Sequence, residues 1–468
     1  MKLSQLANSG RRPELPLTLQ LPMGQLRIVS WLRTLPSKRY VAEAVWITPS
    51  CEETVLVKLY CGTRAQAKMQ VELKGCKKLQ QAVLPTPKVI GSGVKGSVAW
   101  LLLQWLPNAV TLSEKFDLSV DDCSRASVTM PPTFAAVLQL LAAMHNKQLL
   151  QADLHLDNFI CSKGDWYLID AAEIEPVTNI SREKNLAMLL AQLPHAWWPG
   201  AIASYGELNQ AQVMVEARKH RLWRARDLVA KSGRDCSLFQ FKHNFRQLRL
   251  LWRSDADSLT PLLDNIEAVM ASGKMLKDGG SSTVVLVDGV GEWQGRSLVV
   301  KRYNVKNFGH FLRRCLRSSR AMHSWQQGHL WRALELPTAK PLAVIEKRFG
   351  LLRLGGYLVT EYTPGEDIID AFDRVYSDGL IEQFGVLLQR MADYRLSHGD
   401  FKGTNLLASK QGLSFIDLDA ARLHSKLNAW RKSFLSDLNR LQRNWSKHSC
   451  CYERVSKLVA SVKSQLLN

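Results

Sequence analysis

Hydrophobic and polar positions follow a regular order along the first half of the chain. The segments "YVAEAVWI" and "TVLVKLY" are rich in β-branched and aromatic residues and predict strands. Residues 63–82 predict a helix that ends before the two prolines of "LPTPKVI". "SVAWLLLQWL" predicts a buried strand and "PPTFAAVLQLLAAMHNKQLL" a helix with an apolar face. Helical segments are expected to continue to about residue 253.

The second half repeats this order. "STVVLVDG" and "SLVVKRYN" predict strands, and residues 308–334 predict a basic helix that ends at "LPTAKPLAVI". "GYLVTEYTPGEDI" predicts a strand and a hinge, and "LIEQFGVLLQRMADYRLS" a helix. A chain of 468 residues is too long for one ordinary core. With the seam expected in residues 254–272, the predicted domains are 1–253 and 254–468.

One short pattern of polar residues recurs at the same place in both halves. An Asp is followed five residues later by an Asn, and a second Asp follows an apolar strand; the copies are Asp153, Asn158, Asp170 and, 247 positions later, Asp400, Asn405, Asp417. This arrangement is typical of protein-kinase-like phosphotransferases. We therefore expect an α+β fold with two tandem protein-kinase-like domains, each with a small β-rich N-lobe and a mainly helical C-lobe.

The three residues of each copy have distinct expected roles. Asp153 and Asp400 would accept or orient the proton of a substrate hydroxyl during phosphoryl transfer. The Asn and the later Asp would hold magnesium, which prefers oxygen ligands and keeps several waters. The fixed gap of twelve residues between them in both copies predicts a short hairpin that brings both to one metal.

A lysine stands in an apolar strand ahead of each copy. Lys58 lies in "VLVKLY" and Lys301 in "LVVKRY". In kinases such a Lys binds the ATP phosphates and pairs with a helix Glu. Glu72 is the expected partner of Lys58, whereas the second half has Ser324 or Trp325 at the matching place. Lys301 is then held by another carboxylate or by none.

A glycine-rich turn is present in the second half only. Gly279, Gly280 and Ser281, in "KDGGSSTVVL", could offer backbone N–H groups to phosphates, although a plain hairpin turn explains the same residues. The first half has "RTLPSKRY" at this place, without glycine. The parts expected to bind ATP are therefore divided unequally between the halves.

The net charge of +20 predicts an anionic partner, such as nucleic acid, an anionic membrane surface or a phosphorylated substrate. From Arg218 to Arg253 the chain has eleven Lys or Arg and two acidic residues. Five aromatic residues interleave with this run and fit an interfacial surface, and nucleic acid as well: Trp223, Phe239, Phe241, Phe245 and Trp252. No apolar run of 18 residues is present, so no transmembrane helix is expected.

The second half resembles the bacterial lipopolysaccharide kinase family, the Kdo and heptose kinase-like (InaA-type) proteins. The resemblance is carried by "HGDFKGTNLL", "FIDLD", "LVVKRYN", "SRAMHSW" and "LPTAKPLAVIEKR". The first half looks like a more divergent member through "LPSKRYVAEAVW", "VLVKLY", "VELKGCKKLQQAVLPTPKV" and "LLQADLHLDNFI". Together these segments indicate a tandem-domain member.

The resemblance implies a kinase-like fold, ATP and magnesium as cofactors, and phosphorylation of a sugar in the lipopolysaccharide inner core. It implies a cytoplasmic location, peripheral to the inner membrane. By matched position, Lys58 and Lys301 would bind ATP phosphates. The missing helix Glu weakens the expectation of activity for the second half, and the absent glycines do so for the first.

Two other functions fit parts of the sequence. One or both halves could be a pseudokinase, with the chain acting as a scaffold or regulator of envelope assembly. The motif "HGDFKGTN" also suits a kinase of a soluble small molecule. Nucleic-acid binding is not expected, because no nucleic-acid motif is present. The sugar, its hydroxyl and the oligomeric state do not follow from the sequence.

Overall fold

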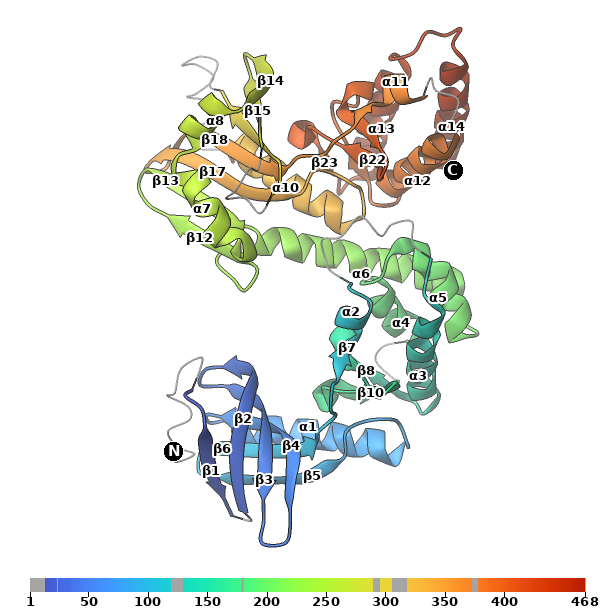
Figure 1. The fold of residues 1–468 in the computed structure, drawn as a ribbon. Coiled ribbons are helices and arrows are strands. Elements are labelled where there is room, and N and C mark those ends of the chain that lie inside the picture. Colours follow the sequence, from blue (N-terminus) through green and yellow to red (C-terminus); the bar gives the residue numbers. More distant parts are fainter. Residues whose placement is uncertain are drawn as a thin grey trace. The chain divides into compact units, whose positions relative to one another are not determined.

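The computed structural model describes residues 13–22, 24–118, 129–177, 181–288, 295–304, 318–372 and 378–467. The chain divides into two compact units: the first comprises residues 1–119 and 128–217, the second residues 120–127 and 218–468. Both units mix helices and strands, which confirms the α+β class (Figure 1). The sequence-based boundary between residues 253 and 254 stays a prediction; the compact units divide earlier, between Ala217 and Arg218.

An antiparallel sheet begins the first unit, with strand order β1-β2-β3-β4-β6-β5. Helix α1 lies between β4 and β5 in the chain and contacts β4, β5 and β6. The elements are β1 (Leu17–Leu21), β2 (Gly24–Leu35), β3 (Arg39–Ile47), β4 (Glu52–Cys61), α1 (Ala65–Gln81), β5 (Val89–Lys95) and β6 (Val98–Gln104). The predicted strands and the predicted helix of this region are all present.

The rest of the first unit is mainly helical and packs around one hydrophobic core. Large aromatic side chains are fully buried there, Phe134, Phe159 and Trp198 among them. The elements are β7 (Val110–Thr111), α2 (Leu112–Lys115), α3 (Ala135–Asn146), β8 (Leu149–Gln151), β9 (Phe159–Ser162), β10 (Asp165–Leu168), β11 (Ile174–Pro176), α4 (Arg182–Leu190), α5 (Trp198–Tyr205) and α6 (Gln210–Lys231), which contains the division between the units.

The sheet of the second unit contains the same core of five strands. Its order is β12-β13-β17-β18-β16-β15-β14, in which β14-β15-β16-β18-β17 corresponds to β2-β3-β4-β6-β5. The elements are β12 (Phe239–His243), β13 (Gln247–Trp252), α7 (Ala256–Asp264), α8 (Ile266–Ser272), β14 (Lys274–Gly279), β15 (Ser282–Val287), β16 (Leu298–Tyr303), α10 (Arg320–Ala333), β17 (Pro341–Phe349) and β18 (Leu352–Glu361).

The region before residue 254 differs from the sequence prediction. Helical segments were expected up to residue 253, but β12 and β13 form a hairpin, and β13 pairs with β17. The burial of Leu248 and Leu250 depends on that pairing, nearly a hundred residues away, which local periodicity does not reveal. Residues 254–272, expected to be a seam, form α7 and α8. These helices pack against the face of this sheet opposite to α10.

The helical part of the second unit buries a core around Phe384, Phe401 and Phe415. Its elements are β19 (Glu366–Asp367), α11 (Ile368–Phe372), α12 (Asp378–Asp393), β20 (Leu396–Ser397), β21 (Leu406–Ser409), β22 (Gly412–Phe415), β23 (Arg422–Leu423), α13 (Leu427–Gln442) and α14 (Cys450–Leu467). Residues 308–317 of the predicted basic helix lie outside the described residues; α10 accounts for the remainder. Within the described ranges, no helix combines the length and apolarity needed to cross a membrane.

Candidate functional site

The Asp–Asn–Asp pattern of the second unit folds around a short hairpin, as predicted. Asn405 ends a 3-10 helix (Gly403–Asn405), β21 and β22 pair antiparallel, and Asp417 follows β22. The N–H of Ile416 donates to the carbonyl of Asn405 at 3.0 Å, so Asn405 and Asp417 leave the backbone at neighbouring points. The side-chain amide of Asn405 donates to the carbonyl of Asp400 at 2.8 Å. These bonds hold the three residues in one corner.

The first unit builds a matching hairpin, but there the side-chain oxygen of Asn158 accepts a hydrogen bond from the N–H of His155 at 2.8 Å. Strands β9 and β10 pair antiparallel, and the N–H of Ile169 donates to the carbonyl of Asn158 at 2.9 Å. Asp170 has φ 57° and Asp417 has φ 60°. This left-handed conformation is uncommon outside glycine, and such residues concentrate at functional sites. The same exception at matched positions indicates that both units need these carboxylates aimed in one direction.

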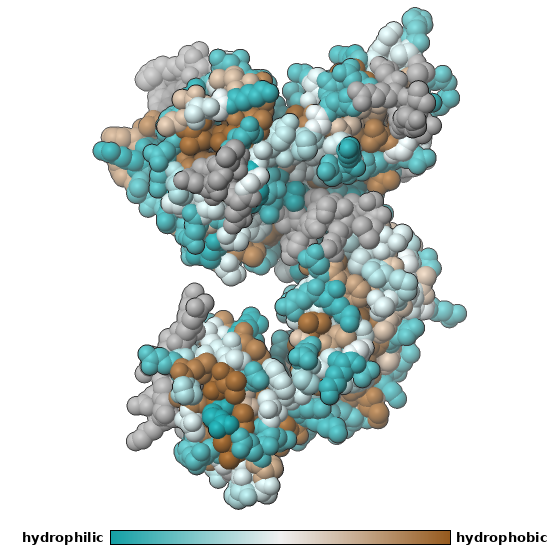
Figure 2. All heavy atoms as spheres, viewed as in Figure 1, coloured by the Kyte–Doolittle hydropathy of each residue, from teal (hydrophilic) through white to brown (hydrophobic). Residues whose placement is uncertain are grey.

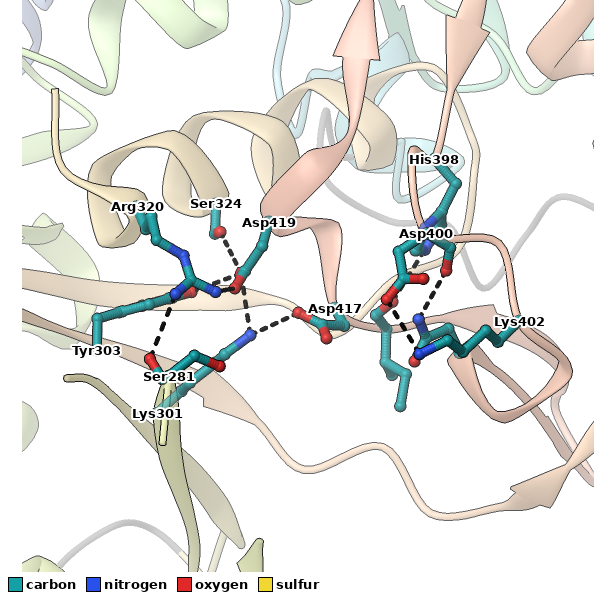
Figure 3. A network of polar contacts seen from close by, with 12 residues as sticks. Ser281, Lys301, Tyr303, Arg320, Ser324, His398, Asp400, Lys402, Asp417 and Asp419 are labelled. Atoms are coloured by element: carbon teal, nitrogen blue, oxygen red, sulfur yellow. Dashed lines mark hydrogen bonds and ion pairs between the residues drawn. The ribbon is translucent and has the colours of Figure 1, made fainter. Parts of the chain in front are cut away.

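Lys301 lies between two carboxylates in the second unit (Figure 3). Its ammonium is 2.6 Å from Asp417 and 2.9 Å from Asp419. The hydroxyls of Tyr303 and Ser324 donate to Asp419 at 2.8 and 2.7 Å. Asp419 thus holds Lys301 from the loop after β22, and α10 contributes a serine instead of an acid.

Lys58 is held by the carboxylate predicted from the sequence. Its ammonium pairs with Glu72 of α1 and is 2.8 Å from Asp170. The hydroxyl of Tyr60 also donates to Glu72. Tyr60 and Tyr303 each stand two residues after their lysine. The two units therefore share a Lys–Tyr–carboxylate cluster, but the carboxylate comes from different elements.

The charges in both clusters are stabilised in spite of burial. Burial disfavours the ionised form of Asp419, but Lys301 and the hydroxyls of Ser324 and Tyr303 outweigh this and lower its pKa to about 2. Burial likewise disfavours charged Lys58, but Glu72 and Asp170 outweigh it and raise the pKa of Lys58. Asp419 and Lys58 therefore carry their charges at neutral pH.

A cavity adjoins each lysine. The cavity of the second unit has a volume of about 420 Å³ and that of the first about 600 Å³. On one wall of each, an apolar side chain stands two residues before the lysine, Val299 or Leu56; on the other wall lies Leu407 or Ile160, from the strand after the Asn. An apolar slot that ends at a lysine and two oxygen ligands can accept a planar ring attached to phosphates.

In each unit a threonine that the sequence analysis missed joins the segment after α1 or α10 to a hairpin, β9–β10 or β21–β22. We call this contact the threonine clamp. The hydroxyl of Thr338 donates to the carbonyl of Phe415 at 2.8 Å, and that of Thr86 to Leu168 at 2.9 Å. Both threonines belong to the "LPT" that ends the preceding helix, and both line the cavities. The repeated "LPT" was the available signal, but it predicted only a helix end.

The surroundings of the two catalytic-type Asp residues differ. Asp400 lies 2.7 Å from Arg440 of α13 and 3.6 Å from Lys402. Asp153 lies 2.9 Å from His155, the residue matching Lys402, and its side chain is 68% exposed. Lys402 and Arg440 also line a basic depression, whose other residues are Lys432, Leu435, Ser436, Asn439, Arg443 and Asn444.

A buried acid, Asp437, binds the backbone of the loop that carries Asp400. Asp437 accepts hydrogen bonds from the N–H groups of His398 and Gly399 at 2.7 and 3.0 Å. Burial raises the pKa of Asp437 to about 6 in spite of these bonds. The first unit uses neutral Asn185, whose amide donates to the carbonyl of Gln151 at 2.8 Å.

The predicted glycine-rich turn does not line the cavity of the second unit. Gly279 ends β14, and Gly280 and Ser281 form the turn to β15. None of the three lines the 420 Å³ cavity, whereas the next residue, Ser282, does. Their binding to phosphates stays a prediction. Of the other predicted residues, Lys58, Glu72 and Asp170 line one cavity, and Lys301, Asn405 and Asp417 the other. Asp153, Asn158 and Asp400 line neither cavity.

An Asn and an Asp in each unit could hold a divalent cation. Their amide and carboxylate oxygens suit magnesium, whose remaining ligands are commonly water and phosphate oxygen. In the described part of the chain, no group of three His, Cys, Asp or Glu residues forms a denser metal centre.

Comparison with known families extends to part of the chain. The lipopolysaccharide kinase (Kdo/WaaP) family matches residues 274–459, less than half of the sequence but most of the second unit. A comparison with curated proteins gave no significant match. The resemblance of the first half stays a prediction. Residues 274–459, which contain Lys301, Asp400, Asn405 and Asp417, are thus similar to the lipopolysaccharide kinase (Kdo/WaaP) family, as the motifs of the second half predicted.

Proposed function

We propose that the chain is an ATP- and magnesium-dependent kinase that phosphorylates a sugar hydroxyl of the lipopolysaccharide inner core at the cytoplasmic face of the inner membrane. The matched family is a kinase family and implies ATP use and a lipopolysaccharide-type substrate. The observation that carries the proposal is the convergence of Lys301, Asn405 and Asp417 on one cavity within the matched segment.

Each cavity wall has a role in nucleotide binding. The adenine ring lies between Val299 and Leu407, and Lys301 contacts the phosphates. Asn405 and Asp417 would hold magnesium, which would supply positive charge to the transferring phosphate. Asp419 would keep Lys301 in place if Asp417 served as a metal ligand.

Asp400 orients the acceptor. Its carboxylate takes the proton of the sugar hydroxyl while that oxygen forms a bond to the γ-phosphorus, and the bond from the γ-phosphorus to the bridging oxygen of ADP breaks. Arg440, at 2.7 Å, keeps the carboxylate aimed. The products are ADP and the phosphorylated sugar.

The basic depression beside Asp400 suits an acceptor that carries anionic groups. Lys432 and Arg443 line it together with Lys402 and Arg440. Carboxylates and phosphates of a lipopolysaccharide core would be attracted there, and a neutral soluble sugar would not. This supports the lipopolysaccharide acceptor over a soluble small molecule.

Both compact units are kinase-like domains in this proposal, and the second carries the transfer. The matching order of five strands, the Lys–Tyr–carboxylate cluster and the threonine clamp support a common fold. The first unit binds ATP but has His155 in place of Lys402, and Asp153 contacts no Arg in the described residues. It therefore acts as a regulatory, pseudokinase-like domain.

The test measures magnesium-dependent transfer of phosphate from radiolabelled ATP to purified core lipopolysaccharide. We expect Asp400→Ala in the intact chain to reduce transfer at least a thousandfold, and the matched Asp153→Ala to reduce it less than threefold. Unchanged transfer in both variants would show that the chain is not this kinase. A large loss in Asp153→Ala alone would assign the activity to the first unit.

A further inference from the structure

Two hairpin ends in the sheet of the second unit lie side by side. Phe245 lies in the turn between β12 and β13, and Phe349 ends β17. The N–H of Gly350 donates to the carbonyl of Phe245 at 2.9 Å, and the two Phe rings meet edge to face with centroids 4.8 Å apart. We call the apolar residues gathered here the hairpin tip: Phe245, Phe349, Leu351, Leu352 and Leu354.

The hairpin tip exposes large hydrophobic side chains to solvent. Phe245 is 59% exposed, Phe349 62% and Leu351 82%. Hydrophobic residues reach the surface over both sheets (Figure 2), so exposure alone assigns no role. Three such side chains at the ends of two joined hairpins form a contiguous projection, which indicates a partner surface.

The charge around the tip selects the kind of partner. Residues 241–254 and 347–360 contain no Asp or Glu, and seven cations: Lys242, Arg246, Arg249, Arg253, Lys347, Arg348 and Arg353. Five of these cations already pair with acids of the protein: Arg348 and Arg353 with buried Glu346, Lys347 with Glu267, Arg249 with Asp264, and Arg253 with Asp235. Lys242 and Arg246 flank Phe245, and neither forms an ion pair within the described ranges.

We propose that the hairpin tip inserts into the headgroup region of an anionic lipid bilayer. Phe and Leu side chains at the tip would enter the boundary between headgroups and acyl chains, while Lys242 and Arg246 would contact lipid phosphates. Nucleic acid is a poorer occupant, because leucine side chains offer it no stacking surface. The proposal gives the membrane contact of the proposed kinase and rests on that function for its setting only.

The test uses the intact chain and sedimentation with vesicles of phosphatidylglycerol and phosphatidylcholine, or of phosphatidylcholine alone. Wild type is expected to bind the anionic vesicles at least tenfold more tightly, and added salt to weaken this binding. Phe245→Ser/Leu351→Ser should reduce binding at least tenfold, and Lys242→Gln/Arg246→Gln should reduce its salt dependence. The matched control is Val29→Ser/Val83→Ser, which changes exposed apolar residues of the first unit and should leave binding unaltered.

Several results would overturn the proposal: equal binding of wild type to both vesicle types, no binding at all, or undiminished binding of the tip variant. Because neither ATP nor acceptor is present, the outcome is independent of catalysis. A tip variant that loses vesicle binding but still binds ATP supports the proposal whether or not core lipopolysaccharide is the acceptor. Thermal unfolding of each variant shows that the sheet is intact.

Discussion

The two units hold their strand lysine with carboxylates from different places. In the first, Glu72 comes from α1 and the loop residue matching Asp419 is Ala172. In the second, Asp419 comes from the loop and α10 supplies Ser324, the residue matching Glu72 by its distance from "LPT". The second acid of the cluster therefore comes from a different element in each unit. Each lysine still has two carboxylates beside it, Asp170 or Asp417 being the one at the matched position.

This difference changes how the second unit is understood. The absence of a helix Glu suggested an incomplete site, but Lys301 has its partner. Where the partner lies on a helix, movement of that helix can release the lysine, which is a known means of control in kinases. In the second unit the partner follows Asp417 by two residues, so the lysine and the metal-binding corner are kept together. The first unit retains the arrangement that a shift of α1 could switch.

The largest effect is expected from moving the carboxylate. Asp419→Ala removes one of the two carboxylates beside Lys301, which is also the partner of Arg320 and of two buried hydroxyls, and should raise the KM for ATP about a hundredfold. Asp419→Ala/Ser324→Glu places the acid on α10, as in the first unit, and should recover most of the affinity. Steady-state kinetics at varied ATP separate KM from kcat. If the double variant folds but recovers nothing, the proposed role of Asp419 is wrong.

A smaller effect is expected from the basic depression next to Asp400 of the second unit. Lys432→Gln/Arg443→Gln removes two cations that do not contact Asp400, and should raise the KM for core lipopolysaccharide about tenfold. The KM for ATP should stay the same, because neither residue lines the 420 Å³ cavity. Initial rates at varied acceptor give the result. An equal change in both KM values would contradict an acceptor-binding role.

The smallest expected effect concerns the pH dependence of stability. It arises from Asp437, which binds the loop of Asp400, whereas the first unit has Asn185 in this role. The pKa of Asp437 is raised in the folded state to about 6, so the folded protein binds this proton more tightly than the unfolded chain. Its contribution to stability is therefore present below about pH 4 and is lost as the pH rises through 6. Asp437→Asn should remove this dependence.

Melting temperatures of wild type and Asp437→Asn across pH 4 to 7 provide the measurement. The difference between them should shift by a few degrees in favour of the variant as the pH rises. A constant difference would mean that Asp437 keeps one charge state throughout this range. Asp117→Asn serves as the control for a carboxylate change in the first unit.

Local sequence was sufficient for the features formed by neighbouring residues. The twelve-residue gap between Asn405 and Asp417 predicted a hairpin, and the hairpin is present, because chain connectivity alone brings its strands together. The α+β class also followed from the strand and helix patterns. So did the pair of Lys58 and Glu72, which lie fourteen residues apart in the chain.

Other features depended on contacts between distant segments. Asp419 meets Lys301 across 118 positions, and its role cannot be read from the "DLD" in which it stands. Strand β13 is a strand because it pairs with β17, and the hairpin tip exists because two turns a hundred residues apart share a hydrogen bond. The amino-acid sequence was enough to predict the hairpin between Asn405 and Asp417, because its spacing is local. Which carboxylate holds each lysine, and which apolar residues stay exposed, followed only from the folded structure, because burial and pairing depend on the whole fold.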